Sequence, residues 1–341
     1  MRYSTDVLVF GTMGNIGSEV QRLLASHGLQ VAAVPFQQNV FCDEPGYRRT
    51  LVSAIADCRP EIVFPIRNPL AMARFKGLLE QGVPLSTVLN RRKMGTQWEE
   101  AVRSVRIAVE SEEKVRLLDS KVRCHALARE LGIMQPAVYD KPEDVPEGMK
   151  VVFKRDVSFG GHGVHLPKSI EALNNLIVHQ SPGEPFLIEE FIEGKDYSLD
   201  VVRWRDCIVS GGYECLPAKD CRPARLSPKC FGPVDGYMSQ SKNDTEGNFG
   251  PAGCRIVLHE RDKVLEKMRA CAKTILEHLD YHGVCGFDFR ADTSGMVWLL
   301  ECNPRFTGGV ATQAAAGLDI PWELYRLMKE NDIVPACHGL S

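Results

Sequence analysis

No stretch of the sequence approaches the ~18 consecutive apolar residues that a membrane-spanning helix needs. Positive charge is not in excess either, because Lys and Arg number 41 while Asp and Glu number 44, giving a net charge of −3. A protein that binds nucleic acid by releasing counterions needs a positive excess, so nucleic acid is a poor candidate partner. The first residues also lack the basic and apolar regions of a secretory signal. These absences predict a soluble, cytoplasmic protein without a membrane partner.

The sequence also lacks closely paired cysteines, although it contains twelve of them. Cys215, Cys221 and Cys230 lie 6 and 9 residues apart, unlike the tight Cys-x-x-Cys pairs of structural zinc sites. Reduced thiols are therefore the favoured interpretation, and a zinc module in this region is the alternative. The composition is ordinary for a globular protein, with 44% hydrophobic and 25% charged residues, and 341 residues allow two to three domains.

The N-terminal part of the chain has the pattern of a βαβ unit. A β-branched run at 6–10 enters the glycine turn 11–17, and an amphipathic helix over 18–27 and a strand over 29–34 follow. This order predicts an α/β domain with a doubly wound parallel sheet. The turn reads Gly-x-x-Gly-x-x-Gly, which serves either for tight packing or for binding a phosphate at the helix start. No acid that would hold a ribose follows the second strand, so an NAD(P)-dependent oxidoreductase is only a remote alternative.

Two acids and an amide near the C-terminus form the first candidate site. A hairpin is predicted from strands at 286–290 and 296–301, with Asp288 on the first strand and Glu301 closing the second. Asn303 lies two residues after Glu301 and so shares its side of the chain. Hard oxygen donors of this kind suit Mg²⁺. The alternative is a pair of surface acids with Asn303 capping a turn.

Two further segments carry residues suited to a nucleotide. Lys154 ends a strand and precedes a glycine-rich stretch with Gly160, Gly161 and Gly163, which resembles a flap over phosphates or is a hairpin tip. Residues 186–200 form an apolar strand with paired acids, a turn and an alternating strand, which could present backbone groups to a purine edge. Taken alone, this third segment is an ordinary hairpin.

In their order and spacing, these segments resemble the ATP-grasp superfamily of carboxylate–amine ligases. The resemblance covers about residues 112–330. It rests on the helix opening Asp-Ser-Lys at 119–121, the strand lysine with its flap, Glu-Glu-Phe-Ile-Glu-Gly at 189–194, and Gly-Phe-Asp-Phe before Glu-Cys-Asn-Pro-Arg. It implies a Rossmann-like pre-ATP-grasp domain followed by a two-lobed ATP-grasp fold. The implied boundaries are 1–110, 111–188 and 189–335, with a turn-rich excursion at 205–255.

The resemblance also implies roles for individual residues. Lys121 and Lys154 would contact the ATP phosphates, and Arg305, with Lys154, would assist catalysis by holding the acyl phosphate or carboxylate. Asp288, Glu301 and Asn303 would bind Mg²⁺, with Mn²⁺ as an alternative metal. The remaining nucleotide-binding residues, in the flap, the adenine hinge and the ribose contact, would be Ser158, Gly160, Gly161, Gly163, Glu189, Glu190, Ile192 and Asp196.

The implied reaction activates a small-molecule carboxylate with ATP and joins it to an amine. A carboxylase or carbamoyl-phosphate-like enzyme and a nucleotide-binding protein without ligase chemistry are the alternatives that share the same nucleotide site. D-alanine–D-alanine ligases carry an arginine where this chain has Gly286, and here Arg305, Arg222 or Arg225 would supply that charge. The segment Gly308–Gln313 serves either for carboxylate binding or for packing. Members of the family often form dimers, so the resemblance is also compatible with a homodimer. Cys302 is expected to pack in the core.

Overall fold

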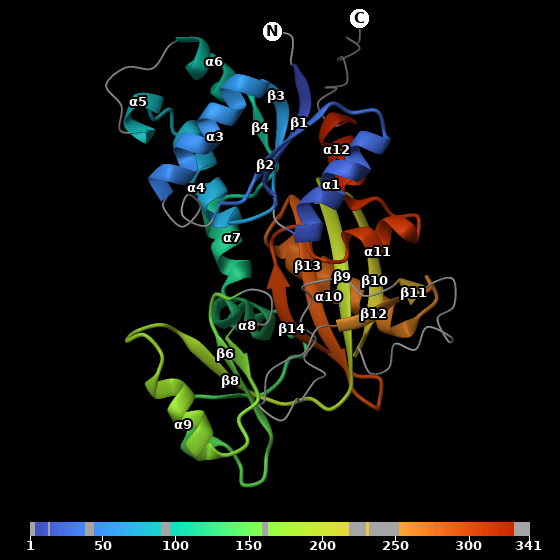
Figure 1. The fold of residues 1–341 in the computed structure, drawn as a ribbon. Helices are drawn as coiled ribbons and strands as arrows, with labels where there is room; N and C mark the ends of the chain where they lie inside the picture. The colour runs from blue at the N-terminus through green and yellow to red at the C-terminus, as the bar shows by residue number, and fades with distance from the viewer. Residues whose placement is uncertain are drawn as a thin grey trace, which may run out of the picture.

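The computed structural model of the protein describes residues 4–12, 14–37, 44–89, 96–158, 163–217, 230–231 and 252–330. These residues form three β-sheets with helices packed against them (Figure 1). No helix in the described part of the chain combines the length and the apolar character needed to cross a lipid bilayer. The predicted division of the chain at residues 110 and 188 stays a prediction.

The first sheet is parallel, as the βαβ pattern predicts, with strand order β2-β1-β3-β4. Gly11 takes a left-handed φ of 81°, and a Cβ on Gly17 would lie 2.6 Å from the Thr12 Cα. A left-handed backbone therefore accounts for Gly11, and close packing accounts for Gly17. The elements are β1 (Thr5–Thr12), α1 (Gly14–Ser26), β2 (Val31–Pro35), α3 (Glu44–Cys58), β3 (Pro60–Pro65), α4 (Pro69–Glu80), α5 (Leu85–Val88), α6 (Thr96–Ser104) and β4 (Arg106–Ile107).

The second, smaller sheet has the order β5-β8-β6-β7 and lies at the lower left of Figure 1, with α9 packed on it. Two expectations for the preceding segment were wrong. The charged sequence predicts a helical connector over 97–113, but this segment contains strand β4. The apolar spacing predicts a single helix over 117–131, but it breaks at Ser120, whose extended backbone ends one helix and whose hydroxyl caps the next. The elements are α7 (Glu112–Asp119), α8 (Lys121–Glu130), β5 (Val138–Tyr139), η1 (Pro142–Asp144), β6 (Val151–Arg155), β7 (Val164–His165), α9 (Ile170–Val178) and β8 (Phe186–Glu190).

The third sheet has the order β11-β12-β10-β9-β13-β14. Much of the expected excursion at 205–255 lies outside the described residues, but its two ends are strands β10 and β12, so it is not turn-rich throughout. The expected hairpin is present, and the Asp292 carboxylate accepts hydrogen bonds from two backbone N–H groups of its turn. The elements are β9 (Lys195–Trp204), β10 (Cys207–Pro217), β11 (Cys230–Phe231), β12 (Ala252–Val257), α10 (Lys263–His278), β13 (Gly283–Ala291), β14 (Val297–Asn303), α11 (Val310–Ala315) and α12 (Ile320–Glu330).

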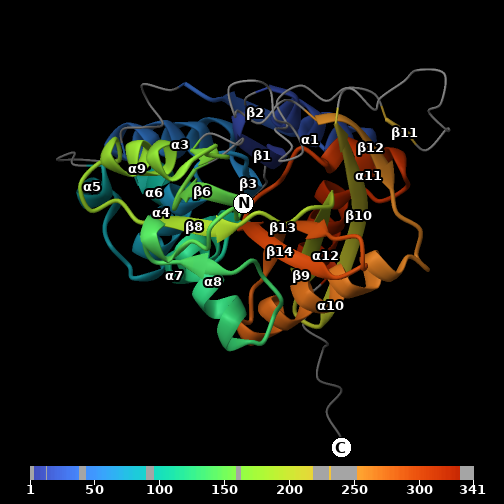
Figure 2. The ribbon, with the colours of Figure 1, turned by 90° about the horizontal axis from the view of Figure 1, so that it is seen from below.

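Separate hydrophobic cores hold the parts together. One face of the third sheet packs against α8 and α10 through residues such as Leu199, Phe287 and Ile275. A further core joins Val9 and Phe64 of the N-terminal sheet to residues of α12. Seen from below in Figure 2, β6 and β8 lie beside β13 and β14, and a hydrogen bond from Lys154 to Leu300 joins the two sheets. Several of the predicted site residues lie where these two sheets meet.

Candidate active site

The register of three strands puts polar side chains on one face of the third sheet. Asp196 and Ser198 alternate along β9, so their side chains share a face, while the intervening Tyr197 points to the opposite, hydrophobic face. Across the ladder, Arg290 of β13 pairs with Asp196, and Asp288 pairs with Ser198. Asp288 also pairs with Glu301 of β14. The result is a continuous polar surface facing away from the helices α8 and α10.

The predicted metal ligands meet at the β13–β14 ladder. Asp288 accepts a hydrogen bond from the Ser198 hydroxyl at 2.5 Å and one from the Asn303 amide at 3.1 Å. Glu301 lies directly across from Asp288. Three oxygen-bearing side chains are thereby gathered at one end of the polar face.

The donor set of Asp288, Glu301 and Asn303 fits Mg²⁺, which binds through carboxylate and other oxygen ligands and retains water. The described residues hold no group of three or more His, Cys, Asp or Glu side chains arranged for a metal. The predicted set contains only two carboxylates, with an amide as the third ligand. A site with so few protein ligands suits an ion that is also held by substrate phosphates.

A β-bulge links the third sheet to the smaller one. The pairing of β13 with β14 shifts after Asp288, so that Leu300 has no partner of its own. The Leu300 carbonyl accepts a hydrogen bond from the Lys154 ammonium at 3.3 Å. Bulges often redirect a group beside an active site. Here the bulge turns a backbone oxygen toward a predicted phosphate-binding lysine.

Lys154 forms a buried ion pair with Glu189. The Lys154 Nζ lies 2.5 Å from the Glu189 Oε2, and the two residues are 1% and 2% exposed. They come from the adjacent strands β6 and β8 of the smaller sheet. Burying two charges is costly unless they are paired, so removing either residue would leave an uncompensated charge in the interior. The pair holds the lysine beside the third sheet, within hydrogen-bond distance of the Leu300 carbonyl.

Lys121 is the first residue of α8, and its ammonium group contacts Glu301 of the third sheet. Its Nζ lies 3.2 Å from Glu301 Oε2 and 3.2 Å from the Ser158 hydroxyl, and the side chain is buried. The helix start is fixed by Asp156, whose carboxylate accepts hydrogen bonds from the Ser120 hydroxyl and the Val122 N–H. Two lysines, Lys121 and Lys154, are thereby directed at the acidic end of the polar face.

These cations change the acidity of Glu301. Burial alone would raise the pKa of its carboxyl, but Lys121, Lys154 and Arg305 outweigh burial and lower the pKa to about 2. Glu301 is therefore ionised throughout the neutral range. An ionised oxygen beside two lysines suits a site that binds both a cation and phosphate oxygens.

The phosphate flap is only partly described. Gly160 and Gly161 lie outside the described residues, as do Arg222, Arg225 and Cys221. Gly163 follows the gap with a left-handed φ of 83°, and its carbonyl accepts a hydrogen bond from the Arg155 N–H. Ser158 lies before the gap and contacts Lys121. The role of the flap stays a prediction.

The predicted nucleotide hinge follows β8. The Glu190 N–H donates to the Ala137 carbonyl, and the Ile192 carbonyl accepts from Arg290 Nη1 at 2.9 Å. Asp196 Oδ1 accepts from Arg290 Nε at 2.8 Å. A single buried arginine therefore contacts the predicted adenine segment and the predicted ribose acid.

Gly194 in this hinge leaves no room for a side chain. A Cβ there would lie 2.1 Å from the Ala291 carbonyl oxygen, which is backbone and cannot move freely. We expect Gly194→Ala to reduce the free energy of unfolding by about 1–3 kcal/mol, measured by urea denaturation. The control is Gly77→Ala in α4, where a Cβ meets nothing within 4 Å and should stabilise the helix by about 0.5–1 kcal/mol. Equal effects of the two substitutions would contradict the close approach at Gly194.

Arg305 lies at the far end of the acidic group. Its Nη1 is 3.5 Å from Asp119 Oδ1, at the end of α7. Burial raises the pKa of Asp119, and the charges of Arg305 and Lys121 oppose that rise. Arg305 thus interacts with both Asp119 and Glu301, the second of which is a predicted metal ligand.

The turn after Arg305 is anchored to β9. Thr307 donates its hydroxyl to Asp200 Oδ1 and accepts the Gly309 N–H, while Gln313 donates to the Gly211 carbonyl. Helix α11 is only six residues long, and the N–H of its N-cap residue, Gly309, already donates to Thr307. These contacts favour packing over carboxylate binding for Gly308–Gln313. The predicted core role of Cys302 agrees with its 5% exposure and its contact with Cys124.

Asp200 is expected to make stability depend on pH. Burial raises the pKa of its carboxyl to about 6, above the ~3.8 of an exposed aspartate. The folded state therefore binds its proton more tightly than the unfolded state, so the stabilisation is present at low pH and is lost as pH rises through 6. Relative to Asp200→Asn, the wild type should lose about 1 kcal/mol of unfolding free energy between pH 5 and pH 8 in urea denaturation. A pH-independent difference between the two proteins would refute this expectation.

Three residues of this network escaped sequence reasoning: Asp156, Ser198 and Arg290. Two of them carried a usable signal, since Ser198 lies two residues after Asp196 and Arg290 two after Asp288, on the same faces of their strands. Asp156 carried none, because its role depends on the break between α7 and α8. The sequence indicates Asp119 only as part of the Asp-Ser-Lys helix opening, without a role of its own.

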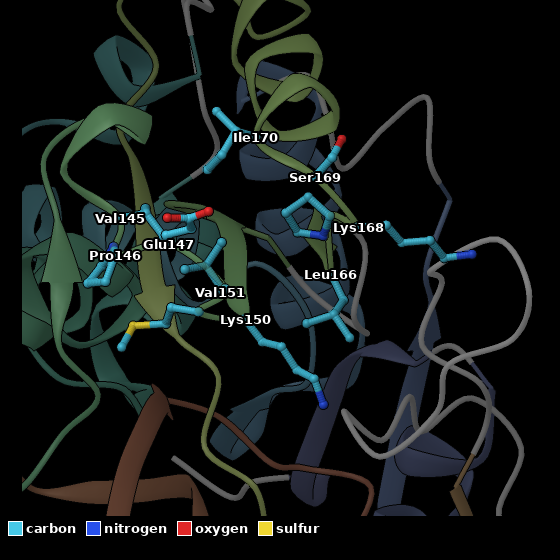
Figure 3. Close-up of a pocket in the computed structure, with 12 residues that line it drawn as sticks. Val145, Pro146, Glu147, Lys150, Val151, Leu166, Lys168, Ser169 and Ile170 are labelled. Atoms are coloured by element: carbon cyan, nitrogen blue, oxygen red, sulfur yellow. The ribbon is translucent and has the colours of Figure 1, made fainter.

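A separate cavity lies on the smaller lobe (Figure 3). It encloses about 640 Å³ and is lined by two segments, 145–151 and 166–170. None of the predicted site residues lines it.

The zinc alternative finds no support in the described part of the chain, where Cys215 is buried and lies near Ser198.

Comparisons with known proteins bear on the fold of the chain. A family model described as "ATP-grasp in the biosynthetic pathway with Ter operon" matches residues 252–340. No curated protein matches the sequence.

Solved structures match nearly the whole chain. The biotin carboxylase of Campylobacter jejuni in complex with β,γ-ATP is similar with a TM-score of 0.62 at 12% identity, over 95% of this chain and 70% of that one. The biotin carboxylase domain of Hydrogenobacter thermophilus 2-oxoglutarate carboxylase, solved as a dimer with MgADP and bicarbonate, gives 0.62 at 14%, over 96% and 70%. An L-amino acid ligase from Bacillus licheniformis gives 0.59 at 12%, over 94% and 73%. The chain therefore has the ATP-grasp fold, and the predicted resemblance and fold class are confirmed.

Proposed function

We propose that this protein is an ATP-dependent ligase that activates a small-molecule carboxylate as an acyl phosphate and joins it to an amine. The observation that carries the proposal is the convergence of Lys121 and Lys154 on Glu301, with Asp288 and Asn303 beside it. Binding a nucleotide without chemistry does not require this combination. The ATP-grasp fold and the ATP- and ADP-bound relatives support ATP as the nucleotide.

In the proposed first step, a carboxylate oxygen attacks the γ-phosphorus of ATP while the bond to the bridging oxygen breaks and ADP leaves. Negative charge spreads over the transferred phosphoryl group, so positioned cations supply most of the catalysis. Lys121 and Lys154 would hold the phosphate oxygens, and Arg305 would hold the acyl phosphate. Mg²⁺, bound by Asp288, Glu301 and Asn303, would neutralise phosphate charge when present.

In the proposed second step, the amine attacks the acyl carbon, phosphate leaves, and the amine loses one proton. No covalent enzyme nucleophile is needed for either step. Burial raises the pKa of the Cys302 thiol well above its usual value, so this residue is unsuited to nucleophilic attack.

The adenine and ribose would bind along the hinge between the two lobes. Glu189, Glu190 and Ile192 would contact the base, and Asp196 would accept hydrogen bonds from the ribose hydroxyls. The flap formed by Ser158, Gly160, Gly161 and Gly163 would cover the phosphates. The partners are then two small molecules, and light scattering would test whether the chain forms a homodimer.

A carboxylation reaction is the second candidate, because two of the similar structures are biotin carboxylases. The test is a screen with Mg-ATP against amino acids and bicarbonate, each with a panel of amines, following ADP and phosphate release and identifying products by mass spectrometry. Release with an amino acid supports the ligase, and release with bicarbonate supports the carboxylase. Absence of both ATP binding and release would overturn the proposal. A nicotinamide titration in parallel tests the remote oxidoreductase alternative.

A further inference from the structure

Arg290 of β13 contacts the hinge on both sides of Gly194 and so links these two segments to the third sheet. It is 2% exposed, although guanidinium groups are rarely buried without partners. Its Nε donates to Asp196 Oδ1 at 2.8 Å, and its Nη1 donates to the Ile192 carbonyl at 2.9 Å. Its guanidinium carbon lies 4.8 Å from the centre of the Phe191 ring. One side chain thereby contacts residues on both sides of Gly194.

We propose that Arg290 is a positioning residue that sets the selectivity of the nucleotide site for the ribose hydroxyls. The inference rests on the proposed nucleotide site, in which Asp196 accepts hydrogen bonds from the ribose. A charge-assisted hydrogen bond to Oδ1 fixes the plane of the Asp196 carboxylate, which a flexible acid would otherwise have to order on binding. The contact with Ile192 fixes the base-binding backbone relative to that carboxylate.

The planar guanidinium is required for this role. It presents several N–H donors in a fixed arrangement and stacks on an aromatic face, whereas a lysine ammonium offers a single charged point. Arg290 and Asp196 are also direct cross-strand partners, so the backbone of β9 and β13 holds both ends of the pair. Arg290→Lys should therefore keep the charge beside Asp196 but lose the link to Ile192 and the stack on Phe191.

The test measures binding of Mg-ADP and of Mg-2′,3′-dideoxy-ADP by isothermal titration calorimetry. The wild type is expected to bind Mg-ADP about tenfold or more tightly than Mg-2′,3′-dideoxy-ADP. The reason is that the Asp196 carboxylate has no ribose hydroxyl to accept a hydrogen bond from when the dideoxy analogue is bound. Arg290→Met should reduce this preference to about threefold or less by weakening ADP binding selectively, with Arg290→Lys intermediate. In an Asp196→Asn background, Arg290→Met should change the preference no further, because the two residues act through one contact.

Arg203→Met is the matched control. Arg203 lies on β9 and, like Arg290 of β13, is a buried arginine that contacts an aspartate and a backbone carbonyl. Its partners are Asp280 and Tyr281, near the opposite end of β9 from Asp196. Its replacement should lower the melting temperature less than Arg290→Met does, because the Asp280 side chain is 70% exposed and is not left as a buried charge. It should leave the preference for ADP unchanged.

The outcomes separate the inference from the proposed function. If the wild type binds neither nucleotide, the proposed nucleotide site is wrong. If the wild type binds ADP but Arg290→Met and Arg290→Lys weaken both nucleotides equally, or match Arg203→Met, then Arg290 is purely structural and the inference is overturned. Should Arg290→Met fail to fold, Arg290→Lys against the wild type decides the question by the same ratio.

Discussion

Replacing Glu301 by glutamine is expected to reduce ADP release by about 100-fold or more, while the protein remains folded. Glu301 lies opposite Asp288 across the β13–β14 ladder and 3.2 Å from the Lys121 ammonium. The substitution keeps the size of the side chain but removes the negative charge that would bind the metal. Lys121 keeps its contacts with Ser158, so the fold loses little. Turnover would be followed by coupled detection of ADP, and folding by circular dichroism.

Glu214→Gln is the control for this experiment. Glu214 belongs to the same sheet but pairs with Lys195 and lies across from Tyr197, whose side chain points to the hydrophobic face. Its replacement should leave turnover within about twofold of the wild type. An active wild type with an equally active Glu301→Gln variant would exclude the metal role of Glu301.

Lys154→Met is expected to reduce the free energy of unfolding by about 3–5 kcal/mol. The reason is the carboxylate of Glu189, which is 2% exposed and would be left buried without its cation. Replacing both partners, as Lys154→Met with Glu189→Leu, should recover most of that loss, because no uncompensated charge remains. Urea denaturation followed by tryptophan fluorescence measures both variants. The double variant should stay inactive, since it lacks a predicted phosphate-binding lysine.

The chain offers a matched exposed pair as a control. Lys150 and Glu193 are 2.6 Å apart, close to the 2.5 Å of the buried pair, but their side chains are 67% and 70% exposed. Lys150→Met should therefore change the unfolding free energy by less than about 1 kcal/mol. If the two lysine variants were equally stable, burial would not be what makes the Lys154–Glu189 pair important.

The sequence predicts that the three proposed metal ligands share one hairpin, because strand alternation is local. Asp288, Glu301 and Asn303 lie on one short hairpin, so their shared position follows from a turn and a period of two. The contact of Arg290 with Asp196 could not be found in this way. It depends on the register between β9 and β13, which are separated by about 80 residues and by the strands and helix between them.

The helix break at Ser120 shows a different limit. The apolar pattern over 117–131 continues through the break, so periodicity predicts one helix. The break depends on Asp156, which accepts from the Ser120 hydroxyl and from the Val122 N–H but belongs to a distant strand end. A tertiary contact therefore overrides the local pattern, and it places Lys121 at the start of its own helix. The bulge at Leu300 has the same character, since nothing in the sequence of β14 marks it.

The central place of β9 in its sheet has a consequence for how the protein folds. β9 forms a local hairpin with β10, but its other neighbour, β13, arrives only after a long loop has closed. The polar face therefore comes into existence in a late, cooperative step, and not by docking of a preformed lobe. Amide protons of β9 should accordingly be among the slowest to exchange with deuterium, and they should open only when the whole sheet unfolds.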